Sequence, residues 1–142
     1  MNRTDAVLAI LASANGLALS PVQLQKAAFL LDKNGLVAEG PRFNFVPYDY
    51  GPFDRSVYDE ASALAMQGLS SISPSPSGRW NVYSATPVGV ERGVDVLANL
   101  PDNLRTYVRD VTNWVRGQSF ASLVKSIYQQ YPEMKANSIF QD

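Results

Sequence analysis

Residues 43–69 read FNFVPYDYGPFDRSVYDEASALAMQGL, and this stretch decides how the chain folds. Pro47 and Pro52 each fix their own φ and push the preceding residue away from the helical region. Gly51 supplies backbone freedom where the chain must turn sharply. Three aromatic residues crowd the same bend: Tyr48, Tyr50 and Phe53. These features predict a rigid aromatic corner that folds back onto the core or onto a partner.

A helix is expected to follow this corner. It should begin near Phe53 or Asp54, because a carboxylate in the first turn meets the positive end of the helix dipole. Apolar residues recur along it at spacings of three and four: Val57, Tyr58, Ala61, Leu64 and Ala65. Gly68 is the residue expected just after its end. Before the corner, the alternation in FNFV, residues 43–46, predicts a short strand.

Two short helices are expected before the corner. The first should be capped at Thr4 or Asp5 and end at an Asn-Gly pair, and Asp5 favours a structural helix over a signal peptide because it interrupts the apolar run. The second has Ser20 as its N-cap and Pro21 as its first residue, and it ends at another Asn-Gly pair. Two helices joined in this way are typical of the start of a helix-turn-helix arrangement. Residues 38–42 are expected to form a turn or loop.

A small hairpin is expected after the helix that follows the corner. Residues 69–73 and 79–83 predict two strands, joined by a loop rich in Ser, Pro and Gly that should be mobile. Thr86 is the expected N-cap of the next helix, with Pro87 as its first residue. This order of helix, strand, loop, strand and capped helix is typical of winged-helix domains.

The rest of the chain is predicted to be helical. Gly89 and Gly93 weaken the first of these helices, or else let another helix approach it closely. A longer helix should start at residues 101–102, and Ser119 should cap the last one. The apolar residues of the C-terminal tail, Ile139 and Phe140, are expected to dock against the rest of the chain.

Length and composition set the class of protein. At 142 residues, with 46% hydrophobic and 18% charged residues, the chain is long enough for one compact domain and short for two. We therefore expect residues 1–142 to form a single domain of the α+β class: mainly α with a small β-hairpin, a winged-helix-like helical fold with about six helices. No apolar run approaches the roughly 18–20 residues that span a bilayer, so we expect a cytoplasmic protein without membrane segments.

The chain has neither histidine nor cysteine. Their absence from the sequence excludes the usual zinc sites, triads with a histidine base and cysteine nucleophiles. The only adjacent acidic residues are Asp59 and Glu60, and neighbours on a helix point about 100° apart, so this pair belongs on a solvated face. We expect no enzyme, no cofactor and no metal site. An enzyme that uses carboxylates and arginines is the remaining alternative.

Three segments resemble the Panacea domain, also called the SocA-like antitoxin domain. They are LQKAAFLLDKNG (24–35), FVPYDYGPFDRSVYDEASALAMQGL (45–69) and YSATPVG (83–89). In that family a Leu-Gln-Lys helix is followed by a Tyr-Gly-Pro corner and a helix ending in Gly-Leu. The resemblance implies a prokaryotic or phage protein, commonly paired with a toxin that it neutralises by direct contact or delivers to a protease. Members of the family often carry an extra DNA-binding module, and we expect these 142 residues to have no room for one.

The predicted partner-binding surface includes the aromatic corner and one tryptophan, both chosen by residue type. Residues enriched at protein interfaces are Tyr, Trp, Phe, Met and Arg. The candidate partner-binding residues are Tyr48, Tyr50, Gly51, Pro52, Phe53 and Trp80. Trp80, beside Arg79 at the end of the mobile loop, is expected to be exposed. The corner itself is equally open to a second interpretation, in which it serves only as scaffold.

The competing prediction is a winged-helix DNA-binding transcriptional regulator. A recognition helix should offer Lys or Arg to phosphates, but the helix after the corner carries Asp54, Asp59 and Glu60 against Arg55 alone. The predicted hairpin of residues 69–83, which would be the wing of such a domain, offers only Arg79. Together with a formal net charge of −1, this favours a protein partner over nucleic acid. The oligomeric state is left open.

Overall fold

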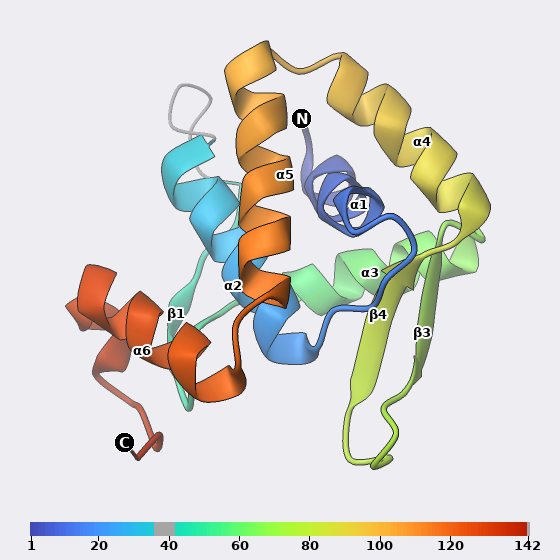
Figure 1. Ribbon diagram of the computed structural model, residues 1–142. Helices are drawn as coiled ribbons and strands as arrows, with labels where there is room; N and C mark the ends of the chain where they lie inside the picture. The colour runs from blue at the N-terminus through green and yellow to red at the C-terminus, as the bar shows by residue number, and fades with distance from the viewer. Residues whose placement is uncertain (36–41, 142) are drawn as a thin grey trace.

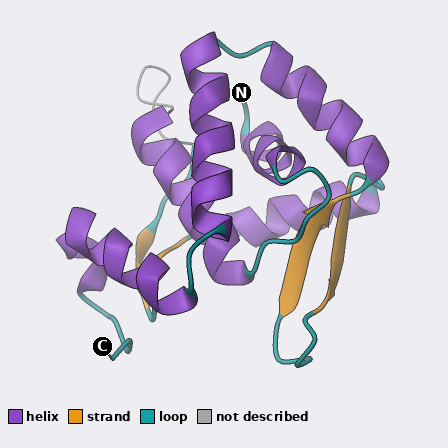
Figure 2. Ribbon diagram, viewed as in Figure 1, coloured by secondary structure: helices purple, strands orange, loops and turns teal. Residues whose placement is uncertain are grey.

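The computed structural model describes residues 1–35 and 42–141. Over these residues the chain forms six α-helices and two short antiparallel hairpins, which confirms the mainly α, α+β class (Figure 2). The elements are α1 (Arg3–Ser13), α2 (Pro21–Leu30), β1 (Val46–Tyr48), β2 (Gly51–Phe53), α3 (Ser56–Met66), β3 (Ser70–Pro74), β4 (Asn81–Ala85), α4 (Pro87–Ala98), α5 (Asp102–Arg116) and α6 (Phe120–Gln130). A π-helical turn, Leu31–Gly35, extends α2, and a 3-10 turn, Pro132–Lys135, follows α6.

Helix α1 lies at the centre of the molecule, among α3, α4 and α5 (Figure 1). Every residue from Ala6 to Ala12 is buried, so this helix is apolar all round. The expected close approach at a glycine is confirmed at Gly93, where a Cβ would lie 2.2 Å from the Cβ of Ala12. Gly89 is equally constrained, because a Cβ there would lie 1.8 Å from the carbonyl oxygen of Leu69.

The predicted N-caps are confirmed at three helices. The side-chain oxygens of Ser20, Thr86 and Ser119 each accept a backbone N–H of the first turn that follows. At the other end of a helix, Gly68 has φ of +76°, as its place after α3 requires. Local side-chain chemistry therefore sets the starts of these three helices.

Two helix starts differ from the prediction. Helix α1 is capped by Asn2, whose Oδ1 accepts the N–H of Asp5 at 2.8 Å, so neither Thr4 nor Asp5 is its cap. Helix α3 begins at Ser56, later than predicted, because the carboxylate of Asp54 accepts both the N–H and the hydroxyl of that residue. In both helices the side chain of a residue before the first helical residue, Asn2 or Asp54, accepts one of the free N–H groups of the first turn.

The hairpin β3–β4 follows the prediction, with Ser70 paired to Ala85 and Pro74 paired to Asn81. The ends of its loop are joined by a hydrogen bond of 2.8 Å from the Ser75 N–H to the carbonyl of Trp80, and the mobility of the loop stays a prediction. The order of α3, β3, loop, β4 and α4 is the predicted winged-helix order.

The second hairpin, β1–β2, was not predicted. The expected strand at residues 43–46 is wrong, because the ladder starts only at Val46 and runs through the corner itself. Phe43 and Phe45 instead pack into the core ahead of the hairpin. The turn expected at residues 38–42 lies outside the described residues except for Arg42. None of the described helices has the length and apolar character needed to cross a membrane.

Candidate functional site

The aromatic corner is a tight β-hairpin. Pairs form between Val46 and Phe53 and between Tyr48 and Gly51, which leaves a two-residue loop. Gly51 has φ of +109°, a conformation that L side chains rarely adopt. A Cβ at this position would also meet Tyr128 at 3.3 Å, so both the backbone and the space around it require glycine.

Helix α2 holds the exit of this hairpin through Gln25. The side-chain amide of Gln25 donates to the carbonyl of Asp54 at 2.9 Å and accepts its N–H at 3.1 Å. Gln25 is buried, and it is the partner of the Asp54 N–H, which would be costly to leave unpaired; the Asp54 carbonyl also accepts the N–H of Val57 at 3.1 Å. The Leu-Gln-Lys and Tyr-Gly-Pro segments, far apart in sequence, thus form one structural unit.

The carboxylate of Asp54 organises the same exit. It accepts the N–H of Asn44 at 2.6 Å in addition to its two bonds from Ser56. Partial burial raises the pKa of this carboxyl, but the hydrogen bonds from Ser56 and Asn44, with the charge of Arg3, hold it below its usual value overall. Asp54 therefore acts as an ionised acceptor that joins the hairpin to the start of α3.

Stacked rings join the corner to the core. Tyr48 stacks on Phe53 at 4.8 Å between ring centroids, and Phe53 meets the edge of Tyr58 at 5.9 Å. Tyr58 in turn stacks on Tyr83 of β4 at 5.6 Å. Burial, together with the neighbouring Tyr83, raises the pKa of Tyr58 to about 12, so its ring stays neutral at physiological pH.

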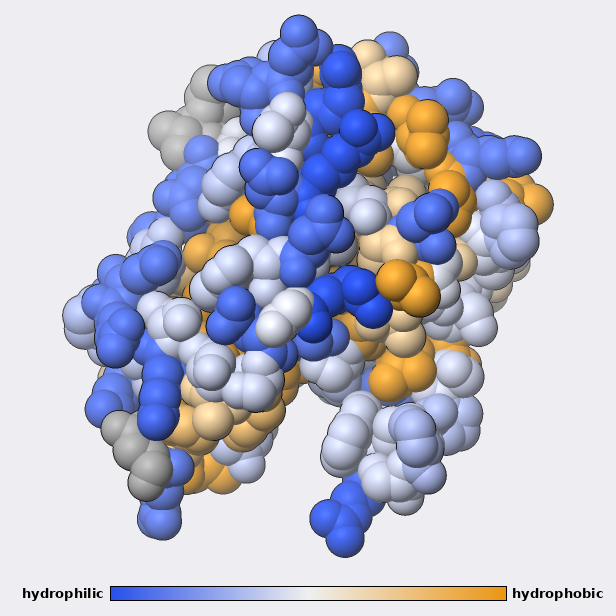
Figure 3. Space-filling view, in the orientation of Figure 1, coloured by the Kyte–Doolittle hydropathy of each residue, from blue (hydrophilic) through white to orange (hydrophobic). Residues whose placement is uncertain are grey.

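The C-terminal segment supports the other side of the hairpin. The N–H of Ile139 donates to the carbonyl of Asp49 at 2.9 Å, and the side chain of Asn137 donates to the carbonyl of Pro47 at 3.2 Å. This confirms that the tail docks, although Ile139 itself remains exposed. Apolar side chains gather beside this end of the chain, at the lower left of Figure 3, whereas α5 presents a hydrophilic face.

Phe120, at the start of α6, extends the aromatic surface. Its ring meets the edge of Tyr50 at 5.0 Å and lies 6.0 Å from that of Phe140. Phe120 is about half exposed. Phe120 was not among the predicted partner-binding residues, because its place beside the corner depends on how α6 packs rather than on any local pattern.

A cavity of about 290 Å³ opens between α2 and the hairpin β1–β2. It is lined by Pro21, Val22, Gln25, Lys26, Tyr48, Asp49, Tyr50, Gly51, Pro52, Phe53 and Tyr58. Lys26 is the unexpected member, since a lysine is almost never fully buried unless it is paired. Its side chain is 2% exposed, and its ammonium lies 3.4 Å from where a Cβ of Gly51 would be. Burial lowers the pKa of Lys26 to about 8.

Five of the six predicted partner-binding residues line this cavity together. Tyr48 and Tyr50 are 51% and 38% exposed, Phe53 is half-buried, and Gly51 and Pro52 are buried beneath them. Trp80 is also exposed, but it belongs to the end of the other hairpin, β3–β4, and is not part of the cavity wall. The corner is therefore neither wholly interior nor wholly surface.

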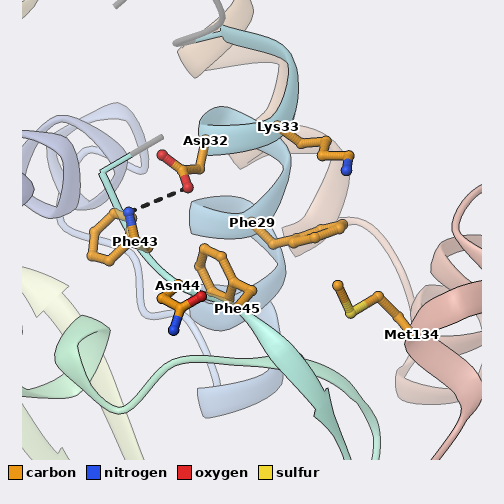
Figure 4. Close-up of a pocket in the computed structure, with 7 residues that line it drawn as sticks. All are labelled: Phe29, Asp32, Lys33, Phe43, Asn44, Phe45 and Met134. Carbon is orange, nitrogen blue, oxygen red and sulfur yellow. Dashed lines mark hydrogen bonds between the residues drawn. The ribbon is translucent and has the colours of Figure 1, made fainter. Parts of the chain in front are cut away.

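A second cavity, of about 440 Å³, lies beside Asp32 in the π-helical turn that extends α2 (Figure 4). The carboxylate of Asp32 accepts the N–H groups of Arg42 at 2.5 Å and Phe43 at 3.3 Å. The carboxylate of Asp32 is thus already occupied by the backbone of residues 42–43, which lead into the corner. Phe29, Phe45 and Met134 supply the apolar wall.

Comparison of the chain with protein-family models, curated proteins and solved structures gave no match. Across residues 1–35 and 42–141, no group of three or more acidic side chains could hold a metal ion. The site itself combines an aromatic rim with one buried ammonium, that of Lys26.

Proposed function

We propose that this chain is an antitoxin-like protein-interaction module, which neutralises a partner toxin by direct binding or as an adaptor for its proteolysis. The observation that supports this is the exposure of Tyr48 and Tyr50 on a hairpin that α2, α6 and the C-terminal segment hold in place. Aromatic side chains fixed in advance lose little entropy when they bind. The resemblance of residues 24–35 and 45–69 to the Panacea domain makes a toxin encoded nearby, acting in the cytoplasm, the proposed partner.

The distribution of charge supports a protein over DNA as this partner. On α3, Asp59 is exposed beside Arg55, while Glu60 accepts the hydroxyl of Thr4 at 2.8 Å. The loop of β3–β4 adds one exposed cation, Arg79. A DNA-binding module normally gathers several Lys or Arg side chains on one face, because each phosphate contact needs a cation.

Co-expression with the product of the adjacent reading frame tests the proposal. Tyr48→Ala, Tyr50→Ala, Phe53→Ala and Trp80→Ala are compared with Met66→Ala, which removes an apolar side chain that is 91% exposed at the end of α3, outside the corner. We expect co-purification to weaken by about tenfold or more in these four variants and to be unchanged in the control, since a few aromatic residues carry most interface energy.

Circular dichroism establishes that each variant is folded before its binding is compared. Unchanged binding in all four folded variants would remove the proposal. A salt-dependent shift of promoter DNA by the pure protein would put the winged-helix regulator in its place.

A further inference from the structure

Lys26 is a charged side chain whose place in the fold has no structural explanation. Of the two buried charged side chains in the described part of the chain, Asp32 accepts two backbone N–H groups. In contrast, no hydrogen bond or ion pair joins the ammonium of Lys26 to another described residue. A buried charge is normally paired, because its lost hydration has to be replaced.

The surroundings of this ammonium define what could pair with it. Titratable groups face the cavity from the hairpin and from α3: Tyr48, Asp49, Tyr50 and Tyr58. Tyr128 of α6 lies behind Gly51. Asp49 is the one carboxylate among them, and its side chain makes no ion pair with Lys26. The cavity therefore offers one positive charge within a mostly aromatic wall.

We propose that Lys26 receives a glutamate or aspartate side chain of the protein partner, while an apolar neighbour of that residue packs on Tyr48 and Tyr50. This inference rests on the proposed function and specifies the chemistry of its site. One ammonium balances the single charge of a carboxylate, whereas a phosphate group carries about two negative charges and is usually held by several donors at once. The volume of about 290 Å³ lies just below the range of about 300–1,000 Å³ that is usual for small-molecule sites, and it suits a single side chain.

The position of Lys26 also prepares it for such a contact. The ammonium has already lost most of its water in the free protein, so only the carboxylate has to be desolvated on binding. Gln25, the preceding residue on α2, fixes the wall of the cavity by its two bonds to Asp54. The cavity is thus formed before the partner arrives.

Two blocked dipeptides test this inference without knowledge of the toxin. Acetyl-Phe-Glu-amide and acetyl-Phe-Gln-amide differ only in the charge of one side chain. Amide NMR titrations compare them on the wild-type protein, on Lys26→Met and on Lys125→Met, which removes the same charge from an exposed position on α6. We expect the Glu peptide to shift the resonances of β1–β2 and to bind about tenfold more tightly than the Gln peptide.

The preference should vanish in Lys26→Met and persist in Lys125→Met. Equal affinity for the two peptides, a preference that survives Lys26→Met, or no shift by either peptide up to its solubility would overturn the inference. Tighter binding of free 3-phenylpropionate than of the Glu peptide would also overturn it, in favour of a small-molecule site.

The toxin, once isolated, separates this inference from the proposed function. A toxin that needs the tyrosines but binds Lys26→Met as well as the wild-type protein would overturn the role of Lys26 alone. Conversely, a Glu-peptide preference in a chain whose neighbouring gene encodes no binding partner would overturn the proposed function and the assignment of the carboxylate to a toxin.

Discussion

Replacing Lys26 by methionine should make the protein more stable. The pKa of this lysine falls from 10.5 to about 8 on folding, a difference of about 2.5 pH units. At about 1.4 kcal/mol per unit, the buried ammonium costs about 3 kcal/mol at neutral pH. Lys26→Met keeps a side chain of similar length and removes the charge, so the free energy of unfolding should rise by about this amount. The midpoint of thermal unfolding should rise by roughly 10 °C.

The gain should depend on pH in a defined direction. Below pH 8 Lys26 is protonated in both the folded and the unfolded protein, so the full cost of burying the charge is present. Between about pH 8 and 10.5 the unfolded chain holds the proton and the folded protein releases it, so the stability of the wild type rises with pH. The advantage of Lys26→Met should therefore shrink towards zero across this range.

Other groups titrate in the same range but cancel in the comparison. Burial, and to a smaller extent the neighbouring Tyr83, raises the pKa of Tyr58 to about 12. As pH rises, an unfolded tyrosine, with a pKa of 10.0, therefore loses its phenolic proton before the folded Tyr58 does. Stability should then fall above about pH 10 in the wild type and in Lys26→Met alike.

Urea denaturation followed by circular dichroism, at neutral pH and near pH 10, measures these differences. Lys125→Met is the control and should change stability by no more than about 0.5 kcal/mol, because its side chain is exposed. A variant Lys26→Met that is no more stable than the wild type, or one whose gain does not depend on pH, would refute the argument that the charge is buried at a cost.

Three further substitutions test the packing and the site. Gly93→Ala should destabilise the protein by about 1–3 kcal/mol in urea denaturation, since its Cβ would lie 2.2 Å from the Cβ of Ala12 in α1. Gly117→Ala, with no new contact under 3.4 Å, should be neutral, and equal effects of the two substitutions would contradict the close approach of α4 to α1. Gln25→Leu should cost about 1–3 kcal/mol, because it leaves the N–H of Asp54 unpaired and the carbonyl of Asp54 with the Val57 N–H alone; an unchanged melting temperature would show that the two Gln25 hydrogen bonds are dispensable. Tyr48→Ala should lower the free energy of unfolding by only about 1 kcal/mol, the value of one ring stack, yet weaken partner binding by about tenfold or more. A loss of binding that only follows the loss of stability would show that the ring of Tyr48 has a structural role alone.

Helix ends could be predicted from the sequence where the deciding chemistry is local. Ser20, Thr86 and Ser119 cap the helices that they precede, because a hydroxyl two or three residues from a free N–H needs no information about the rest of the fold. The start of α3 could not be predicted in this way. There Asp54 also binds the N–H of Asn44, ten residues earlier, and this contact exists only once the hairpin has formed.

The hairpin β1–β2 escaped prediction for a related reason. Its strands have three residues each and contain Pro47 and Pro52, a residue type that argues against a strand because it cannot donate to the ladder. The two prolines face each other in the register, where the pairing loses little, and contacts with α2, α6 and the C-terminal segment stabilise the hairpin. Three-residue strands depend on such tertiary contacts, which a sequence pattern does not contain.

The tyrosines of the site were predicted from composition, but the buried charge was not. Lys26 lies in a helix that is buried on every side from Leu24 to Leu31, and its apolar neighbours gave a signal that a lysine there would be interior. What could not be foreseen is that the hairpin, some twenty-five residues later in the chain, closes over the ammonium without supplying a carboxylate.

The cost of burying Lys26 also limits what an acidic partner can gain from it. A carboxylate that fully restored the pKa from about 8 to 10.5 would recover at most about 3 kcal/mol, or a few hundredfold in affinity. The remaining affinity must come from the rim, where Tyr48, Tyr50 and Phe120 expose apolar area that no charge can replace. The two contributions are separable in principle, because only the first falls as pH rises past 8, while the second depends on ring area alone. A partner whose affinity is flat across that range binds the tyrosines without using the lysine beneath them.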